Sequence, residues 1–204
     1  MKAEMTVAAN EIQRLRPADE LYPPRVLEVP GRARVLRALG DLDVLNTGPL
    51  LAVVGTRTPN GDILGSTRRV VELAQEFGMV IVSGISPGVD VVAHDAAMDL
   101  HLKTIAVPGC GLEALMKSDR AELAQRIVDD GGLILSPFPS SSPETSERRF
   151  WRNRVIAALC HGLVMVASEP EGGAEEAQRW ARQLERWIIE PTEESADEPT
   201  EDTA

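Results

Sequence analysis

The sequence predicts an α/β fold: a Rossmann-like, doubly wound and mostly parallel sheet with helices on both faces. Short apolar runs of three to five residues alternate along the chain with longer segments of helical pattern. These runs are not alternately polar, which is typical of parallel strands covered on both faces. The connections are short, so right-handed crossovers are expected to place all the strand-end loops at one edge of the sheet.

The first predicted strand, 50–54, reads Leu-Leu-Ala-Val-Val and ends at Gly55. A helix is predicted over 63–77, because an apolar stripe at i, i+3, i+4 and i+7 begins at Val70 and ends at Phe77. The glycine permits a tight turn between the two elements and a close approach of the backbone to a ligand.

The remaining elements continue this alternation. Further strands are expected at 79–83, 104–107, 133–135, 163–166 and 187–189. Further helices are expected at 90–100, 119–128, 152–160 and 175–186. The second of these helices is expected to begin with a capping pair made of Asp119 and Glu122.

The domain organisation is expected to be simple. We expect a lead-in segment, 1–45, a Rossmann-like domain, 46–190, and an acidic tail, 191–204. Within the lead-in, residues 32–39 are predicted to form a short helix. The tail is too polar to bury itself and is expected to be disordered.

The net charge of −11 lies largely in the last 15 residues. From Glu190 to the end there are seven acids and no base, and the rest of the chain carries 25 acids against 21 bases. A generally basic, DNA-coating surface is therefore excluded, whereas a local basic site is not.

The two cysteines, Cys110 and Cys160, do not have the spacing of a zinc site or a disulfide framework. The sequence shows no leader-like segment and no apolar run long enough to span a bilayer. We therefore expect a cytoplasmic protein with no membrane partner.

Glycine-bearing loops follow three of the predicted strands and are expected at the same edge. They are Gly55-Thr56-Arg57, the loop from Ser83-Gly84 to Gly88, and Gly109-Cys110-Gly111. Backbone N–H groups and helix N-termini can bind an anion there, and Arg57 could grip a phosphate with two parallel hydrogen bonds. Alternatively, each glycine serves only a tight turn. No loop is a Walker loop or a Gly-x-Gly-x-x-Gly motif, so no cofactor is expected.

A basic cluster with aromatic residues lies at 148–154, where seven residues include four arginines and two aromatics. This mixture suits a single-strand binder, because arginines hold phosphates and aromatic rings stack on unpaired bases. The alternative is the solvated start of a helix, with Trp151 packed on the core and the arginines paired with acids. The sequence leaves both interpretations open.

Three further residues could carry chemistry, but a structural role is favoured for each. Asp90 and His94 stand at i and i+4 and could form an acid–base pair. We expect instead that Asp90 caps a helix and that His94 is packed or hydrogen-bonded. Cys110, in a glycine turn near helix N-termini, could have a lowered pKa. It is expected to be a small buried residue.

Four motifs in order resemble the DNA-processing protein A family, DprA, also called Smf. They are Val53-Val54-Gly55-Thr56-Arg57, then Val82-Ser83-Gly84 with Gly88-Val89-Asp90 and Ala93-His94, then Ile105-Ala106-Val107 with Gly109-Cys110-Gly111-Leu112, then Arg152-Asn153-Arg154-Val155-Ile156-Ala157. The resemblance covers roughly residues 20–190. It implies a non-catalytic protein that binds single-stranded DNA, commonly as a homodimer. It also implies the loading of a RecA-type recombinase on DNA during natural transformation.

The resemblance also implies a role for particular residues. Gly55, Thr56 and Arg57 would contact phosphate. The floor of the phosphate pocket would be formed by Ser83, Gly84, Gly109 and Gly111, and Gly88 would also belong to the phosphate-binding site. Its basic wall would be formed by Arg152, Asn153 and Arg154.

The chain departs from the family pattern in several places. Pro87 stands where an arginine is usual, Arg149 and Phe150 replace a Phe-Pro pair, and Met116-Lys117 replaces a Tyr-Pro pair. Lys117 and Arg149 are expected to restore positive charge to the DNA-binding site. The resemblance indicates a minimal, divergent member without the C-terminal winged-helix domain.

A second resemblance gives the alternative function. Lonely-guy-type nucleotide phosphoribohydrolases have a Pro-Gly-Gly-x-Gly-Thr-x-x-Glu motif where this chain has Glu171-Gly172-Gly173-Ala174-Glu175-Glu176. Two glycines and a glutamate remain, but the proline, a further glycine and the threonine do not. The alternative is therefore a nucleoside-monophosphate hydrolase, or a protein that binds a small nucleotide without turnover.

Overall fold

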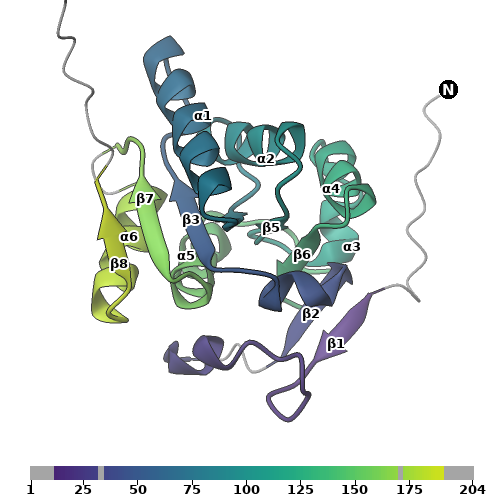
Figure 1. The fold of residues 1–204 in the computed structure, drawn as a ribbon. Helices are drawn as coiled ribbons and strands as arrows, with labels where there is room; N and C mark the ends of the chain where they lie inside the picture. Colours follow the sequence, from purple (N-terminus) through teal and green to yellow (C-terminus); the bar gives the residue numbers. More distant parts are fainter. Residues whose placement is uncertain (1–11, 32–34, 170–171, 191–204) are drawn as a thin grey trace, which may run out of the picture.

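The computed structural model describes residues 12–31, 35–169 and 172–190, which form an eight-stranded sheet flanked by helices (Figure 1). The strand order is β1-β2-β6-β5-β4-β3-β7-β8. From β6 to β8 all neighbours are parallel, whereas β1 and β2 are antiparallel to their neighbours. The predicted Rossmann-like, mostly parallel fold is confirmed.

The parallel strands lie close to their predicted positions. They are β3 (Leu50–Val54), β4 (Val80–Ser83), β5 (Thr104–Ala106), β6 (Leu133–Ser136), β7 (Gly162–Met165) and β8 (Trp187–Ile189). The antiparallel strands are β1 (Gln13–Leu15) and β2 (Leu36–Gly40).

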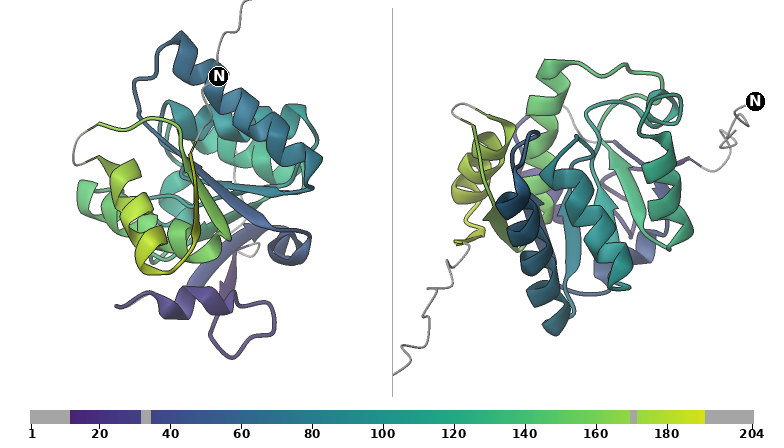
Figure 2. Two further views of the ribbon diagram at one scale, coloured as in Figure 1. Left: turned by 60° about the vertical axis from the view of Figure 1, so that its left-hand side comes forward. Right: turned by 90° about the horizontal axis from the view of Figure 1, so that it is seen from above.

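Helices cover the sheet on both faces (Figures 1 and 2). They are α1 (Gly61–Glu76), α2 (Val89–Asp99), α3 (Leu112–Leu115), α4 (Ala121–Asp129), α5 (Ser146–Leu159) and α6 (Gly173–Gln183). Alternate residues of β3 separate the two layers. Ala52 packs in the cluster with α5 and α6, and Val53 packs in the cluster with α1 and α2. The unbroken apolar pattern of this strand follows from burial on both sides.

The helix predicted over residues 32–39 is wrong. Residues 32–34 lie outside the described residues, and Leu36–Gly40 form β2, which pairs with β6. Side chains pack on both faces of β2, with Leu36 and Ala38 in one core cluster and Leu39 in another, so all three are buried. Such a run does not show the alternation by which a strand is recognised from sequence.

Two helix starts also differ from the predictions. Arg120 precedes α4 and makes no side-chain capping bond, so the predicted capping pair of Asp119 and Glu122 is wrong. Helix α5 begins at Ser146 rather than near Arg152, because the hydroxyl of Thr145 accepts a hydrogen bond from the Arg148 N–H and caps it. The basic cluster therefore lies within the helix.

The predicted acidic tail, 191–204, lies outside the described residues. Among the residues that are described, no helix combines the length and the apolar character needed to cross a membrane.

Candidate nucleic-acid interface

A pocket of about 270 Å³ opens where the parallel strands β3, β4 and β7 end. The loop after β3, the β4–α2 loop and the N-terminal parts of α5 and α6 surround it. Its lining residues are Val54, Gly55, Thr56, Arg57, Ser86, Asp90, Ser146, Arg149, Phe150, Arg152, Asn153, Glu169, Gly172, Gly173 and Ala174. The pocket lies at the strand-end edge, where ligands bind in open α/β sheets.

The loop after β3 is held against α2. A Cβ at Gly55 would lie 2.5 Å from the side chain of Val89, so only glycine fits between strand and helix. The carbonyl of Thr56 accepts a hydrogen bond from the Val89 N–H at 3.1 Å. The following Arg57 is exposed and forms no hydrogen bond or ion pair with any residue that the structure describes. Its guanidinium group is therefore available to a ligand.

Arg152 is a buried and largely neutralised member of the pocket. Its Nη2 lies 3.1 Å from Asp90 Oδ2 and donates to Ser86 Oγ at 3.1 Å, while its Nε has no hydrogen-bond partner among the described residues. The guanidinium group passes directly over Gly84, where a Cβ would lie only 1.9–2.2 Å from it. Gly84 is thus required because an arginine side chain occupies the space above its backbone.

Asp90 orders the β4–α2 loop and does not cap α2. The N-cap of α2 is Gly88. Asp90 accepts a hydrogen bond from the Ser86 N–H, and its Oδ1 lies 3.2 Å from the Ser83 hydroxyl oxygen. The predicted capping role is therefore wrong, because this carboxylate faces Arg152.

His94 is fully buried beneath the same loop. Its ring nitrogens lie 2.6 Å from the Gly84 carbonyl oxygen and 2.7 Å from the Thr104 hydroxyl. Burial lowers the pKa of His94. Because a carbonyl oxygen can only accept, Nε2 carries a proton and donates to Gly84, while the Thr104 hydroxyl lies within hydrogen-bond distance of both Nδ1 and the Ile81 carbonyl oxygen. The expectation that His94 is packed and hydrogen-bonded is confirmed.

Cys110 is buried as expected, and it is not an activated thiol. Burial raises its pKa to about 11.

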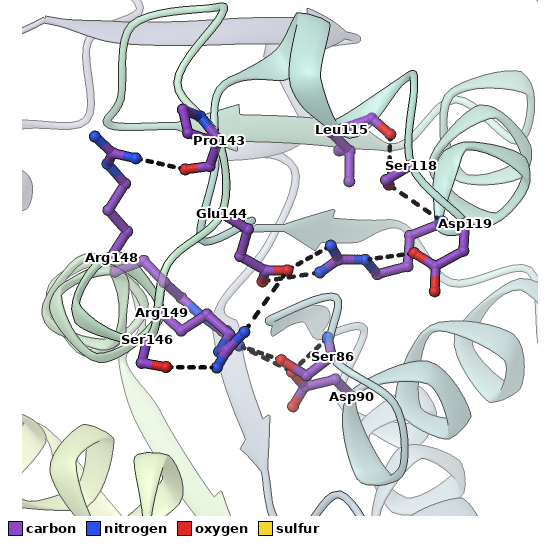
Figure 3. Close-up of polar contacts among 12 residues, drawn as sticks. Ser86, Asp90, Leu115, Ser118, Asp119, Pro143, Glu144, Ser146, Arg148 and Arg149 are labelled. Carbon is purple, nitrogen blue, oxygen red and sulfur yellow. Dashed lines mark hydrogen bonds and ion pairs between the residues drawn. The ribbon is translucent and has the colours of Figure 1, made fainter.

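Arg149 reaches the pocket from the first turns of α5. It donates to Ser146 Oγ at 2.9 Å and lies 3.8 Å from Glu144 (Figure 3). Glu144 is engaged mainly by Arg120, through two hydrogen bonds of 2.5 and 2.9 Å. Arg149 therefore has a fixed position with only part of its charge neutralised. A Cβ at Gly109 would lie 2.6 Å from Arg149 Cγ, so this glycine makes room for the arginine.

An aromatic side chain stands at the edge of the pocket, since Phe150 lines it and is 42% exposed. Asn153 lines the pocket as well, but its amide donates to the Gly173 carbonyl at 2.8 Å and so ties α5 to the start of α6.

Seven of the predicted site residues do not line the pocket, and Gly84 and Gly109, described above, are two of them. The hydroxyl of Ser83 is fully buried and donates to the Val53 carbonyl at 2.6 Å. Gly88, with φ of +90°, lies directly against the backbone of Thr56 and Arg57. A Cβ at Gly111 would lie 2.0 Å from the Pro139 carbonyl oxygen.

The other two predicted residues outside the pocket are Lys117 and Arg154. Lys117 is exposed in the turn between α3 and α4. Arg154 faces α6, with its guanidinium carbon 4.7 Å from the Trp180 ring centroid and its Nε 4.0 Å from Glu176. For these residues a DNA contact stays a prediction.

Glu169 is a charged pocket residue that was not predicted from the sequence. It follows β7, and its Oε1 accepts hydrogen bonds from the hydroxyls of Thr56 at 2.9 Å and Thr58 at 3.2 Å. More than 100 residues separate the partners, and no sequence pattern indicates that they meet.

A family model described as DNA recombination-mediator protein A matches residues 13–202. The chain belongs to this family. The resemblance stated from the sequence motifs is thereby confirmed.

Three curated relatives illustrate the family match. The chain is 33% identical to Protein Smf of Synechocystis over 180 residues, covering 87% of this chain and 45% of that protein. It is 34% identical to Protein Smf of Escherichia coli over 178 residues, covering 86% and 47%. It is 33% identical to DNA processing protein DprA of Streptococcus pneumoniae over 156 residues, covering 76% and 54%. The chain spans about half the length of these relatives.

Two solved DprA structures share the fold. The crystal structure of DprA from Streptococcus pneumoniae superposes with a TM-score of 0.81 at 28% identity, covering 91% of this chain and 65% of that one. The structure of DprA from Helicobacter pylori, described for its single-stranded DNA binding mode, gives a TM-score of 0.75 at 24% identity, covering 91% and 83%. The Helicobacter match bears on the fold alone.

Proposed function

We propose that this DNA-processing family member binds single-stranded DNA non-catalytically, with a backbone phosphate in the pocket at the strand ends. The observation that carries the proposal is the free guanidinium group of Arg57 beside Arg149 and Arg152. Arginines suit phosphates because their planar groups can donate two parallel hydrogen bonds. The match to the DNA recombination-mediator family and to DNA processing proteins supports DNA as the ligand.

The three arginines have different roles in this proposal. Arg152 is fixed by its contacts with Asp90 and Ser86. It therefore forms a rigid part of the pocket lining, and its charge is largely neutralised by Asp90. Arg57 has no such partner among the described residues and makes the principal phosphate contact. Arg149, which is partly neutralised by Glu144, contacts a neighbouring phosphate.

Phe150 gives the interface its preference for unpaired DNA. An aromatic ring stacks on a base only if that base is not already stacked inside a duplex, and such stacking contributes about 1–3 kcal/mol per base. Phe150 directly follows Arg149, is exposed and borders the same pocket. The base attached to a phosphate bound at Arg149 can therefore stack on the Phe150 ring.

The proposal is tested by fluorescence anisotropy with labelled oligo-dT and with a duplex of equal length, each at two salt concentrations. We expect tighter binding of the single strand, with affinity that falls as salt rises because phosphate contacts release counterions. Equal affinity for the duplex, or no binding at low salt, would contradict the proposal.

The alternative enzymatic function is tested with the same preparation. Incubation with nucleoside monophosphates should release no free base if the pocket serves DNA. Release of base at a rate that depends on the protein concentration would favour the nucleotide hydrolase instead.

We further propose that the chain acts as a homodimer that loads a RecA-type recombinase during DNA uptake, as the family resemblance implies. The edge strand β8, where Trp187 is 76% exposed, supports contact with a second copy. Light scattering should give twice the mass of one chain, and a strand-exchange assay should show faster recombinase assembly on DNA. A monomeric mass, or an unchanged rate of assembly, would overturn the respective proposal.

A further inference from the structure

A carboxylate accepts hydrogen bonds from two hydroxyls of the loop after β3, beside Arg57. Oε1 of Glu169 accepts from the hydroxyls of both Thr56 and Thr58, which follow β3 on either side of Arg57. Glu169 lines the same pocket as the arginines. The two threonine hydroxyls in the loop after β3 thus already donate to a carboxylate of the protein itself.

The charges around the pocket do not neutralise this carboxylate. Its charged lining residues are three arginines, Asp90 and Glu169. Asp90 is matched by Arg152 at 3.1 Å. Within the described part of the chain, no arginine, lysine or histidine forms an ion pair with Glu169. Its negative charge therefore acts on whatever anion enters the pocket.

We propose that Glu169 is a selectivity residue that competes with phosphate for Thr56 and Thr58. An isolated phosphate must displace the carboxylate and also bear its repulsion. A DNA strand offsets this cost, because its neighbouring phosphates reach Arg57 and Arg149 together. The pocket consequently discriminates against free phosphate and mononucleotides. This inference rests on the proposed function and adds to it the means by which small anions are rejected.

Substitution by glutamine separates the charge of Glu169 from its hydrogen bonds. In Glu169→Gln the side-chain oxygen still accepts from the threonine hydroxyls, while the negative charge is removed. If Glu169 only orders the loop, this variant should bind ligands as the wild type does. Because Glu169 is exposed, the substitution leaves the core packing unchanged.

The experiment measures the affinity of wild type and Glu169→Gln for labelled oligo-dT, and for thymidine monophosphate by competition. One charge at about 4 Å near a protein surface corresponds to roughly 1–4 kcal/mol, so even at the low end the variant should bind the monophosphate about fivefold more tightly. The gain for oligo-dT should be smaller, because the strand has further contacts. The selectivity for the strand should therefore fall.

A matched control is Glu147→Gln, which removes an exposed acid from the first turn of α5 without touching the pocket lining. This control should leave both affinities unchanged. An equal gain in the control would assign the effect to net charge and overturn the inference.

Unchanged or weaker binding by Glu169→Gln would also overturn the inference, and weaker binding would make Glu169 a ligand contact. If the wild type binds oligo-dT through Arg57 while Glu169→Gln gains nothing, only the inference fails. If neither protein binds DNA or the monophosphate, the proposed function fails with it.

Discussion

At the scale of single residues, several glycines of the site are explained by the side chains that lie over them. A Cβ at Gly84 would overlap the Arg152 guanidinium, and one at Gly109 would contact the side chain of Arg149 at 2.6 Å. The sequence predicts that these glycines contact an anion through their backbone N–H groups. The structure adds that they leave the space through which the arginines reach the pocket.

Gly84→Ala should therefore destabilise the protein. The added methyl group displaces Arg152 from Asp90 and leaves a buried carboxylate without its partner, a change that costs about 3 kcal/mol. The free energy of unfolding in urea measures this effect.

The matched control is Gly65→Ala, on the exposed side of α1, where a Cβ would meet nothing within 4 Å. Alanine is the better helix former, so this variant should be more stable by about 0.5–1 kcal/mol. Equal stability of the two alanine variants would show that Arg152 does not fill the space above Gly84.

At the scale of secondary-structure elements, an ion pair joins the loop before α5 to the start of α4. Arg120 donates to both oxygens of Glu144, and the two side chains are 16% and 20% exposed. Burial tends to raise the pKa of Glu144, but the hydrogen bonds and charge of Arg120 outweigh it, and the pKa is lowered overall. The carboxylate form of Glu144 is thus the one that stabilises the fold.

Glu144→Gln should lower the free energy of unfolding by about 1.5–3 kcal/mol at pH 7, where the charged pair is intact. Because the folded-state pKa is below the unfolded one, this stabilisation is present above the ordinary pKa of 4.5 and is lost as the pH falls through the folded value. Wild type and variant should therefore converge in stability as the pH falls from about 5 through the folded-state pKa of Glu144. A difference that stays constant over this range would contradict the assignment.

Strands and helices differ in how well the sequence predicts them. Strands β3 to β8 were predicted because their unbroken apolar runs are short and end at glycine or at polar turns. The start of α5 was missed, since its cap is Thr145 within a Pro/Ser-rich loop. The predicted apolar stripe of α1 is only partly the buried face of the helix. Ala74 is buried as predicted, but its buried neighbours are Thr67 and Val71, and Phe77 is 67% exposed.

At the scale of the whole molecule, the parallel sheet explains why distant segments form one pocket. The strands β3 and β4 are neighbours and end at the same edge of the sheet. Arg57 follows β3, Asp90 lies in α2 after β4, and Arg152 reaches the same pocket from α5. Right-handed crossovers made this convergence predictable from the order of the elements. Glu169 was not predictable, because its hydrogen bonds depend on the conformation of the β7–α6 loop.

The most direct test of DNA binding at the strand ends is fluorescence anisotropy with labelled oligo-dT on wild type, Arg57→Ala and Arg68→Ala. Arg68 is a matched control, half exposed on α1 and paired with Asp99 at 3.6 Å. Loss of one charge-assisted phosphate contact should weaken binding about tenfold in Arg57→Ala and reduce the salt slope by about 0.7, while Arg68→Ala binds as the wild type does. If Arg57→Ala bound oligo-dT as tightly as the wild type and with the same salt slope, the phosphate site would not be this pocket.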